Sequence, residues 1–226
     1  MRWHVERGGV TGATPLVFLH GLGASSATWQ RCTELLGDTF EVVAVDLLGH
    51  GASPVPDDPD EYTRDIALRD LDEVLAGLDR PPVLVGHSLG GYLSLAHAIT
   101  RPGADRALVV LNTGPGFRDP DKREAWNERS RRNAHKFGVP PQVTNLNLHA
   151  DSLVMDRIGE LTVPVLVLVG DQDRPEYQAS GQYFERKLPN GRLQIIEGGE
   201  HSMHETSHAT DVAALIAAFV VALPES

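Results

Sequence analysis

The chain has 226 residues, of which 41% are hydrophobic and 23% are charged, so it is long enough for one globular domain with a substantial core. Its formal net charge of −11 argues against nucleic acid or an anionic membrane as a partner, because both bind basic surfaces. The single cysteine, Cys32, excludes an intrachain disulfide and is typical of a reducing compartment. No signal peptide and no apolar run of about 18 residues is evident, so we expect a cytoplasmic protein.

Short apolar runs that alternate with helical patterns indicate the elements of the chain. The runs typical of strands buried on both faces are residues 16–19, 42–45, 82–85, 107–111, 163–169 and 193–196, with a further edge strand expected at 3–7. Helices are expected at about 25–36, 64–78, 88–101 and 206–222. This alternation predicts an α/β fold, in which helices cover both faces of a mostly parallel sheet.

One segment interrupts the alternation. About fifty residues without a strand separate residue 111 from residue 163, and they include helical patterns at 121–137 and 151–161. We therefore expect a small helical lid at residues 114–161, inserted into a core formed by residues 1–113 and 162–226. The basic residues of its first part are Arg118, Lys122, Arg123, Arg129, Arg131, Arg132 and Lys136. Acidic residues are interleaved with them, which is typical of a solvated helix face with ion pairs. The alternative is a basic rim that attracts an acidic substrate.

The sequence Gly86-His87-Ser88-Leu89-Gly90 follows a predicted buried strand and opens a predicted helix. A strand that turns directly into a helix brings two backbones close together, and glycine fits on either side of the turn because it has no side chain. The turn would project the Ser88 hydroxyl above the sheet, beside the positive end of the helix. A pattern this short also occurs by chance in ordinary turns, so the rest of the chain must decide.

An acid and a base follow two later strands. Asp171 and Asp173 come directly after the strand at 163–169, and His201 follows the strand at 193–196. Because the carboxyl ends of parallel strands lie at one edge of a sheet, we expect these side chains to lie near the elbow serine. A serine hydroxyl needs a base to take its proton and an acid to orient that base.

Other residues near this edge suit substrate binding. Leu89, directly after the elbow serine, and Leu22, in the loop after the first buried strand, could offer backbone N–H groups as an oxyanion hole. We expect Gly21, His87 and His204 to bind a small-molecule substrate. No histidine or cysteine cluster has the spacing of a metal site, so we expect neither a metal nor another cofactor.

Five motifs in this order resemble those of serine hydrolases with the α/β-hydrolase fold, and the resemblance covers nearly the whole chain. The motifs are His20-Gly21-x-Gly23, Asp46-x-x-Gly49-x-Gly51-x-Ser53, Gly86-His87-Ser88-Leu89-Gly90-Gly91, Gly170-x-x-Asp173 and Gly199-x-His201. It implies an esterase-like or lipase-like hydrolase with a short lid. It also implies the roles of three side chains: Ser88 as nucleophile, His201 as general base and acid, and Asp173 as orienting acid.

The resemblance leaves some alternatives open. Asp171 is a rival for the orienting acid, whereas Asn112, at the position where some relatives carry the acid, is neutral and is excluded. Leu22 and Leu89 take the place of the family's oxyanion-hole donors. The residues before residue 16 are fewer than in the family's usual leading hairpin.

The expected activity is hydrolysis of a carboxylic ester, or a related acyl bond, of a small to mid-sized substrate through an acyl-enzyme. A short lid favours an open pocket and hence such a substrate. The alternatives on the same fold are a hydrolase of carbon–carbon bonds, a lyase, and a non-catalytic small-molecule receptor. A serine at the elbow, where an aspartate would be needed, disfavours dehalogenase and epoxide-hydrolase chemistry. The sequence indicates neither the physiological substrate nor the oligomeric state.

Overall fold

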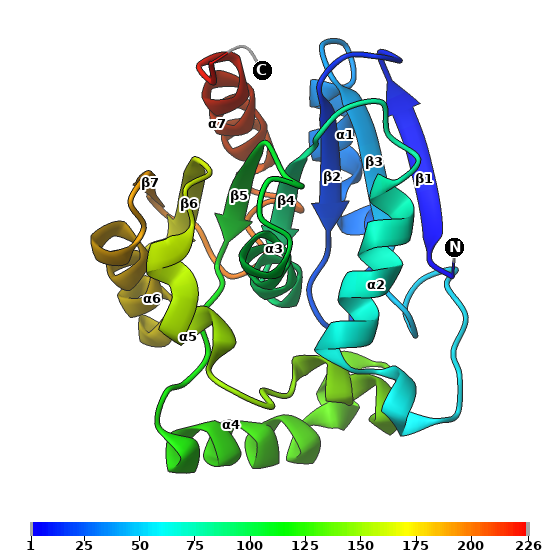
Figure 1. The fold of residues 1–226 in the computed structure, drawn as a ribbon, viewed down its shortest axis with the longest axis vertical. Coiled ribbons are helices and arrows are strands. Elements are labelled where there is room, and N and C mark those ends of the chain that lie inside the picture. The colour runs from blue at the N-terminus through cyan, green and yellow to red at the C-terminus, as the bar shows by residue number, and fades with distance from the viewer. Residues whose placement is uncertain (1, 225–226) are drawn as a thin grey trace.

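The computed structural model describes residues 2–224 and contains one seven-stranded sheet with the order β1-β3-β2-β4-β5-β6-β7 (Figure 1). The strands are β1 (His4–Gly9), β2 (Pro15–Leu19), β3 (Glu41–Asp46), β4 (Val83–His87), β5 (Ala107–Leu111), β6 (Val165–Gly170) and β7 (Gly191–Ile196). Strand β1 pairs antiparallel with β3 at one edge, and all other neighbours are parallel. The α/β fold expected from the sequence is confirmed.

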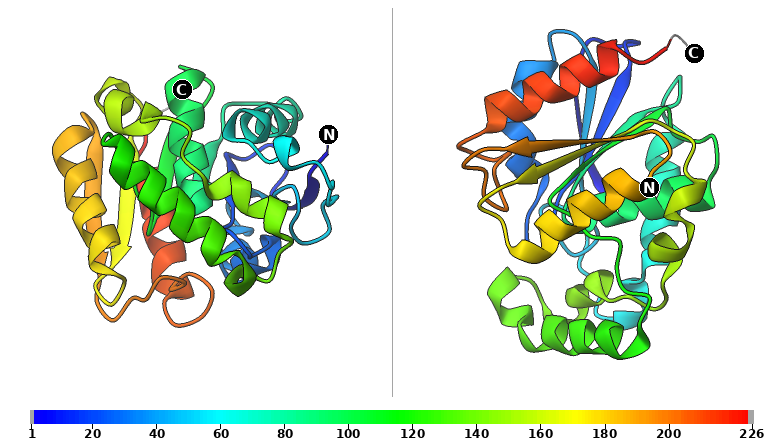
Figure 2. Two further views of the ribbon diagram at one scale, coloured as in Figure 1. Left: turned by 90° about the horizontal axis from the view of Figure 1, so that it is seen from below. Right: turned by 90° about the vertical axis from the view of Figure 1, so that its left-hand side faces the viewer.

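Helices cover both faces of the sheet (Figures 1 and 2). Helices α1 (Gln30–Leu36) and α7 (Ala209–Val221) pack on one face, while α2 (Arg64–Leu75), α3 (Leu89–Thr100) and α6 (Pro175–Lys187) pack on the other. Side chains of each strand alternate between two cores, so that in β2 Phe18 belongs to the first face and Val17 to the second. Each fully buried Val, Leu or Phe stabilises the fold by about 2 kcal/mol relative to an exposed one.

Helix α6 is the element that the sequence patterns did not reveal. Of its residues only Gly181 and Phe184 are buried, so its apolar stripe is short, although Tyr177, Gly181 and Phe184 recur at helical spacing. Pro175 in its first turn is the start signal that could have found it. None of the helices within residues 2–224 combines the length and apolar character that crossing a bilayer requires.

Several predicted helix boundaries are wrong by a few residues. Helix α2 ends at Leu75, three residues before the predicted end, and Gly77 follows it closely. Helix α7 begins at Ala209, because the residues from His201 to His208 form turns at the carboxyl edge of the sheet. That turn region is the part of the chain that carries the candidate base.

Residues 114–161 contain two α-helices, α4 (Pro120–Arg132) and α5 (Leu153–Arg157), and short 3-10 helices. Helix α4 runs across the carboxyl edge of the sheet (Figure 1; Figure 2, left). It begins with Pro120 in its first turn and with the Asp119 carboxylate, which accepts hydrogen bonds from the backbone N–H groups of Asp121 and Lys122. The cap fixes where the helix starts relative to the strand edge below it.

Polar contacts hold this segment in place, together with buried apolar side chains between residues 143 and 161. The Asn127 amide of α4 donates to the backbone oxygen of His149 at 3.0 Å and accepts from its N–H at 2.9 Å. Arg64, at the start of α2, binds the Asp151 carboxylate with two hydrogen bonds of 2.6 and 3.0 Å. Such a two-pronged pair fixes orientation as well as position, so the segment is tied both to itself and to the core.

Candidate active site

The turn from β4 into α3 places Ser88 in a strained backbone conformation, with φ of 51° and ψ of −112°. The glycines around it have no substitute, because a Cβ at Gly86 would overlap the backbone of Gly90, and a Cβ at Gly90 would overlap the backbone of Leu19. Within residues 82–91, Ser88 alone is not fully buried. The tight turn therefore presents one hydroxyl at the edge of the sheet.

Asp173 and His201 contact each other, and His201 lines a cavity together with Ser88. Their loops follow β6 and β7, and His201 Nδ1 and Asp173 Oδ2 are 2.8 Å apart. The Asp173 side chain is 1% exposed, whereas that of His201 is 33% exposed. The His201 ring lies between the rings of His87 and Tyr177, at centroid distances of 4.8 and 4.7 Å. This packing fixes the ring plane, and the bond at Nδ1 leaves Nε2 available for proton exchange.

The structure separates the two candidate acids. Asp171 accepts a hydrogen bond from the backbone N–H of Gly198 at 2.8 Å, which closes a turn between the loops after β6 and β7. Its carboxylate does not contact His201 within the described residues. Asp173 is therefore the carboxylate whose position suits an orienting acid.

The two backbone N–H groups predicted to form an oxyanion hole are free. Leu89 is the first residue of α3, so its N–H has no acceptor within the helix. Leu22 N–H likewise makes no hydrogen bond with any residue between 2 and 224. Each lines a different one of two cavities that meet at Ser88: Leu89 lines the larger, and Leu22 lines the smaller. Unpaired donors at the edge of a cavity suit the developing charge of an oxyanion.

Two histidines brace the loop that carries Leu22. His20 Nε2 accepts a hydrogen bond from the backbone N–H of Leu47, and His50 Nε2 accepts one from that of Gly23, both at 3.0 Å. Burial lowers the pKa of His20 to about 4, so its ring is neutral at pH 7 and can accept. The loops after β2 and β3 are thus joined, which explains why both carry histidine and glycine.

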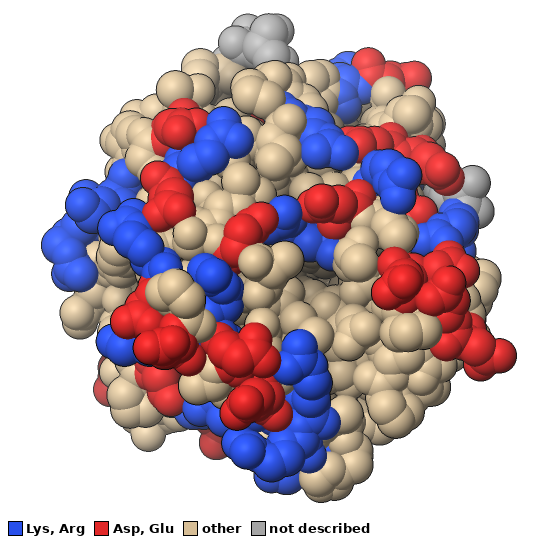
Figure 3. Space-filling view, turned by 60° about the horizontal axis from the view of Figure 1, so that its bottom comes forward, with Lys and Arg blue, Asp and Glu red and all other residues tan. Residues whose placement is uncertain are grey.

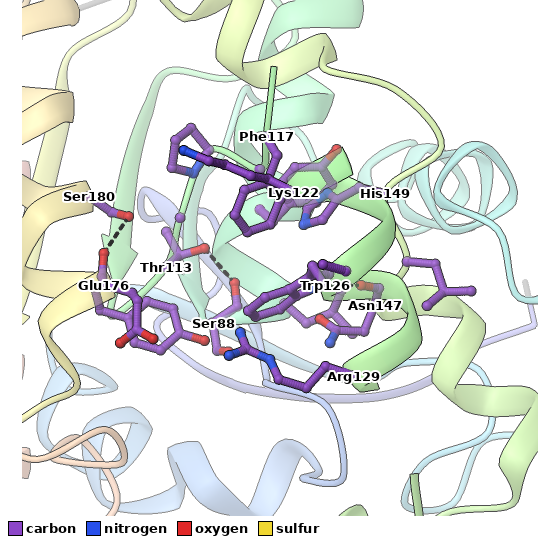
Figure 4. A pocket seen from close by; sticks show the side chains of 18 of the residues that line it. Ser88, Thr113, Phe117, Lys122, Trp126, Arg129, Asn147, His149, Glu176 and Ser180 are labelled. Atoms are coloured by element: carbon purple, nitrogen blue, oxygen red, sulfur yellow. Dashed lines mark hydrogen bonds between the residues drawn. The ribbon is translucent and has the colours of Figure 1, made fainter. Parts of the chain in front are cut away.

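Ser88 lies at the junction of two cavities, of about 530 and 370 Å³, beneath α4. Volumes of this size hold a small organic molecule. The residues that line both cavities are Ser88, Trp126, Arg129, Asn147, Arg174 and Tyr177. Gly21, His87 and His201 line the smaller cavity. Figure 4 shows Trp126 and Arg129 reaching from α4 toward Ser88.

Residues 16–215 match the model of the alpha/beta hydrolase family. The chain belongs to this family. It is 25% identical to a Bacillus subtilis protein provisionally named 2-succinyl-6-hydroxy-2,4-cyclohexadiene-1-carboxylate synthase, over 90% of this chain and 89% of that protein. MenH from S. aureus shares the fold, with a TM-score of 0.84 and 21% identity over 97% of this chain and 98% of the other. So does a thermophilic esterase from Thermogutta terrifontis, solved with malate bound, with a TM-score of 0.79 and 24% identity over 98% and 93%.

In this alpha/beta hydrolase, Tyr177 lines both cavities together with Ser88, and its hydroxyl accepts a hydrogen bond from the Arg174 guanidinium at 2.9 Å. Burial raises the pKa of Tyr177, so its phenol stays protonated at neutral pH. No hydrogen bond joins Ser88 and His201 within residues 2–224, which is common in active sites that hold no substrate. The Thr113 hydroxyl donates to the Ser88 carbonyl at 2.7 Å and holds the elbow backbone (Figure 4). Tyr177 lies on α6, which is why sequence patterns missed it.

Asn112, at the end of β5, organises the loop that carries the base. Its Nδ2 donates to the backbone oxygens of Glu200 at 3.0 Å and His201 at 2.8 Å, and its Oδ1 accepts from the N–H of Gly170 at 3.0 Å. The residue has a left-handed backbone, with φ of 45°, which asparagine tolerates better than most residues. The sequence suggests only a possible acid at this position, because nothing near Asn112 in the chain indicates the backbone groups that it braces.

The replacement Asn112→Asp should destabilise the fold by about 2 kcal/mol at neutral pH, because a buried carboxylate would face two carbonyl oxygens. Burial would raise the pKa of the new acid above its unfolded value. The loss should therefore be largest above the folded-state pKa and should shrink as the pH falls through it. Urea unfolding at several pH values measures this. Asn190→Asp is the control, since Asn190 donates to Thr162 O at an exposed site. Equal losses for the two variants would refute the bracing role.

The structure corrects the expectation for His204. Its ring is fully buried between Trp29 and His87, at centroid distances of 4.2 and 4.4 Å, and it lines neither cavity. Burial lowers the pKa of His204 to about 3, so the ring is neutral and packs behind the site. The turn before α7 directs the ring inward, whereas the sequence suggested contact with substrate.

Proposed function

We propose that this alpha/beta hydrolase cleaves a carboxylic ester, or a related acyl bond, of a small to mid-sized substrate. The observation that carries the proposal is the hydrogen bond from His201 Nδ1 to the buried Asp173, beside a strained and accessible Ser88. The arrangement has the three parts of a Ser-His-Asp triad, in the chain order expected after a nucleophile elbow.

In the proposed reaction, His201 Nε2 takes the proton of Ser88 as its Oγ attacks the substrate carbonyl. The backbone N–H groups of Leu22 and Leu89 stabilise the negative oxygen of the tetrahedral intermediate. His201 then gives the proton to the leaving alcohol, and an acyl-enzyme remains on Ser88. Water, deprotonated by His201, attacks the acyl group and releases the acid, which restores the serine. Asp173 keeps the imidazole in the tautomer that both steps require.

The second candidate function is that of a carbon–carbon bond hydrolase or a lyase, and two observations favour it. The Bacillus subtilis relative carries the name of a synthase. In addition, Tyr177 lines both cavities with Ser88 and its ring lies 4.7 Å from that of His201, so its hydroxyl offers a second group for proton transfer. Both chemistries would use the same serine and histidine, so the pocket decides between them.

A fluorophosphonate probe tests the proposal directly, because it phosphonylates an activated serine. We expect stoichiometric labelling of the wild-type protein at Ser88, read by peptide mass spectrometry, and none in Ser88→Ala. Absence of labelling on folded protein would contradict the activated serine. Steady release of p-nitrophenolate from p-nitrophenyl butyrate separates an enzyme from a receptor, which would give at most one equivalent.

A further inference from the structure

One face of α4 carries a row of cations toward the larger cavity. Lys122, Arg129 and Arg132 all line that cavity, together with Trp126 between them. Their spacing of three or four residues places them along the same side of a helix. On the face of the molecule that carries α4, Lys and Arg side chains lie around a hollow, interleaved with acidic side chains (Figure 3).

The cations on this side lack carboxylate partners, although the chain is acidic overall. None of Lys122, Arg129 and Arg132 forms an ion pair with a residue in the described range 2–224. By contrast, Arg131, on another side of the same helix, pairs with Glu124 at 2.9 Å. Two sides of α4 therefore differ. One side carries the ion pair between Arg131 and Glu124, and the other carries the cations that line the larger cavity.

The balance of charge around the larger cavity is positive. Arg174, from the loop after β6, joins the three cations of α4, and Glu176 is the acidic side chain among the residues that line it. His149, which also lines this cavity, is neutral, because burial lowers its pKa to about 4. An anion that enters this space would therefore meet more positive than negative charge, close to aromatic walls.

Arg129 lies closest to the chemistry within this row. Like Ser88 it lines both cavities, and its guanidinium lies over the ring of Trp126 at 4.8 Å. Burial raises the pKa of the Tyr177 hydroxyl in the same cavities, and the charges of Arg174 and Arg129 act against this rise. Figure 4 shows Arg129 directed from α4 toward the serine. The ring stacking leaves the edge of the guanidinium free for an oxyanion.

We propose that the substrate of this site is an anion, whose carboxylate or similar oxygen group lies against Arg129 while its acyl carbonyl reaches Ser88. Trp126 and Phe117 provide apolar surface for the part of the substrate between these two groups. The placement of the carbonyl rests on the proposed function, whereas the anion site does not. Arginine suits this role because its planar fork can bind both oxygens of a carboxylate.

Binding to Ser88→Ala tests the anion site without turnover. Two ligands differ only in charge: the mono-p-nitrophenyl ester of adipic acid, with a free carboxylate, and the same ester of adipic acid monoamide, which is neutral. By calorimetry at low ionic strength, we expect the anionic ester to bind about tenfold more tightly. The preference should fall as salt is added, because the cations are accessible to solvent. Equal affinities, or no binding of either ligand, would overturn the inference.

A second substitution in this background identifies the residue responsible. Arg129→Gln should reduce the preference for the anionic ester to about twofold or less, because the amide keeps polarity and length but removes the charge. The matched control Arg131→Gln lies on the same helix, in an ion pair directed elsewhere, and should leave the preference unchanged. If both variants lowered the preference equally, the preference would come from the general positive charge of the helix, and the proposed site at Arg129 would be refuted.

The two proposals can fail separately. Release of p-nitrophenolate by the wild-type protein depends on the serine chemistry, whereas the difference in affinity depends only on the cavity. A protein that prefers the anionic ester but releases no p-nitrophenolate keeps the anion site and loses the hydrolase proposal. Turnover of both esters with equal kcat/KM, together with equal affinities, keeps the hydrolase and removes the anion site.

Discussion

Replacing Ser88 or His201 by alanine is expected to lower kcat for p-nitrophenyl butyrate by about 10⁶-fold, to the rate left by the oxyanion hole and binding alone. Without Ser88 Oγ no acyl-enzyme forms, and without His201 the serine keeps its proton at neutral pH. Initial rates of p-nitrophenolate release measure the loss, with circular dichroism to show that each variant is folded.

The double variant Ser88→Ala/His201→Ala should be no slower than either single variant, since the two residues act as one unit. Additive losses would mean that serine and histidine work independently. Ser25→Ala is a matched control: Ser25 precedes a short 3-10 helix without making a side-chain capping bond, and its loss should change kcat less than twofold. Turnover by Ser88→Ala close to that of the wild type would contradict the proposed nucleophile.

The parts of the fold that sequence patterns predicted are those in which burial alone dictates the residue type. The strands β2, β4 and β5 are fully buried, and each appears in the sequence as a continuous apolar run. Because parallel strands end at one edge, locating them also located Ser88, Asp173 and His201 near each other. The α/β fold and the sheet edge that carries Ser88 and Asp173 follow from this regularity, whereas β7, which precedes His201, is largely exposed.

The features that the sequence patterns did not reveal depend on contacts between residues far apart in the chain, and such contacts leave no periodic pattern in the sequence. Asn112 acts through three backbone groups on two other loops, and nothing in its neighbours along the chain indicates that those loops pass nearby. Tyr177 lies on α6, whose polar surface conceals the helix. The basic residues of α4 were visible, but which of them face a cavity depends on where the helix lies across the sheet.

The replacement Asp173→Asn is expected to lower kcat by about 10⁴-fold with little loss of stability, and Asp171→Asn is expected to lower it less than threefold. The large loss expected for Asp173→Asn follows from the second carboxylate oxygen. Oδ1 of Asp173 accepts a 2.7 Å hydrogen bond from the backbone N–H of Arg174. An asparagine must turn its only oxygen to that donor, so its NH₂ group faces His201 Nδ1. The imidazole then carries its proton on Nε2, the atom that should accept the proton of Ser88.

The substitution in Asp171 is matched in chemistry and lies in the same loop. An asparagine there can still accept the hydrogen bond from Gly198 N–H through its oxygen, so the turn between the two loops is kept. Comparing kcat of the two variants between pH 6 and pH 9 measures the difference, with thermal unfolding to show that both are folded. If Asp171→Asn were the more damaging change, His201 would be oriented by Asp171 in the working enzyme. The 2.8 Å contact with Asp173 would then not be the catalytic one.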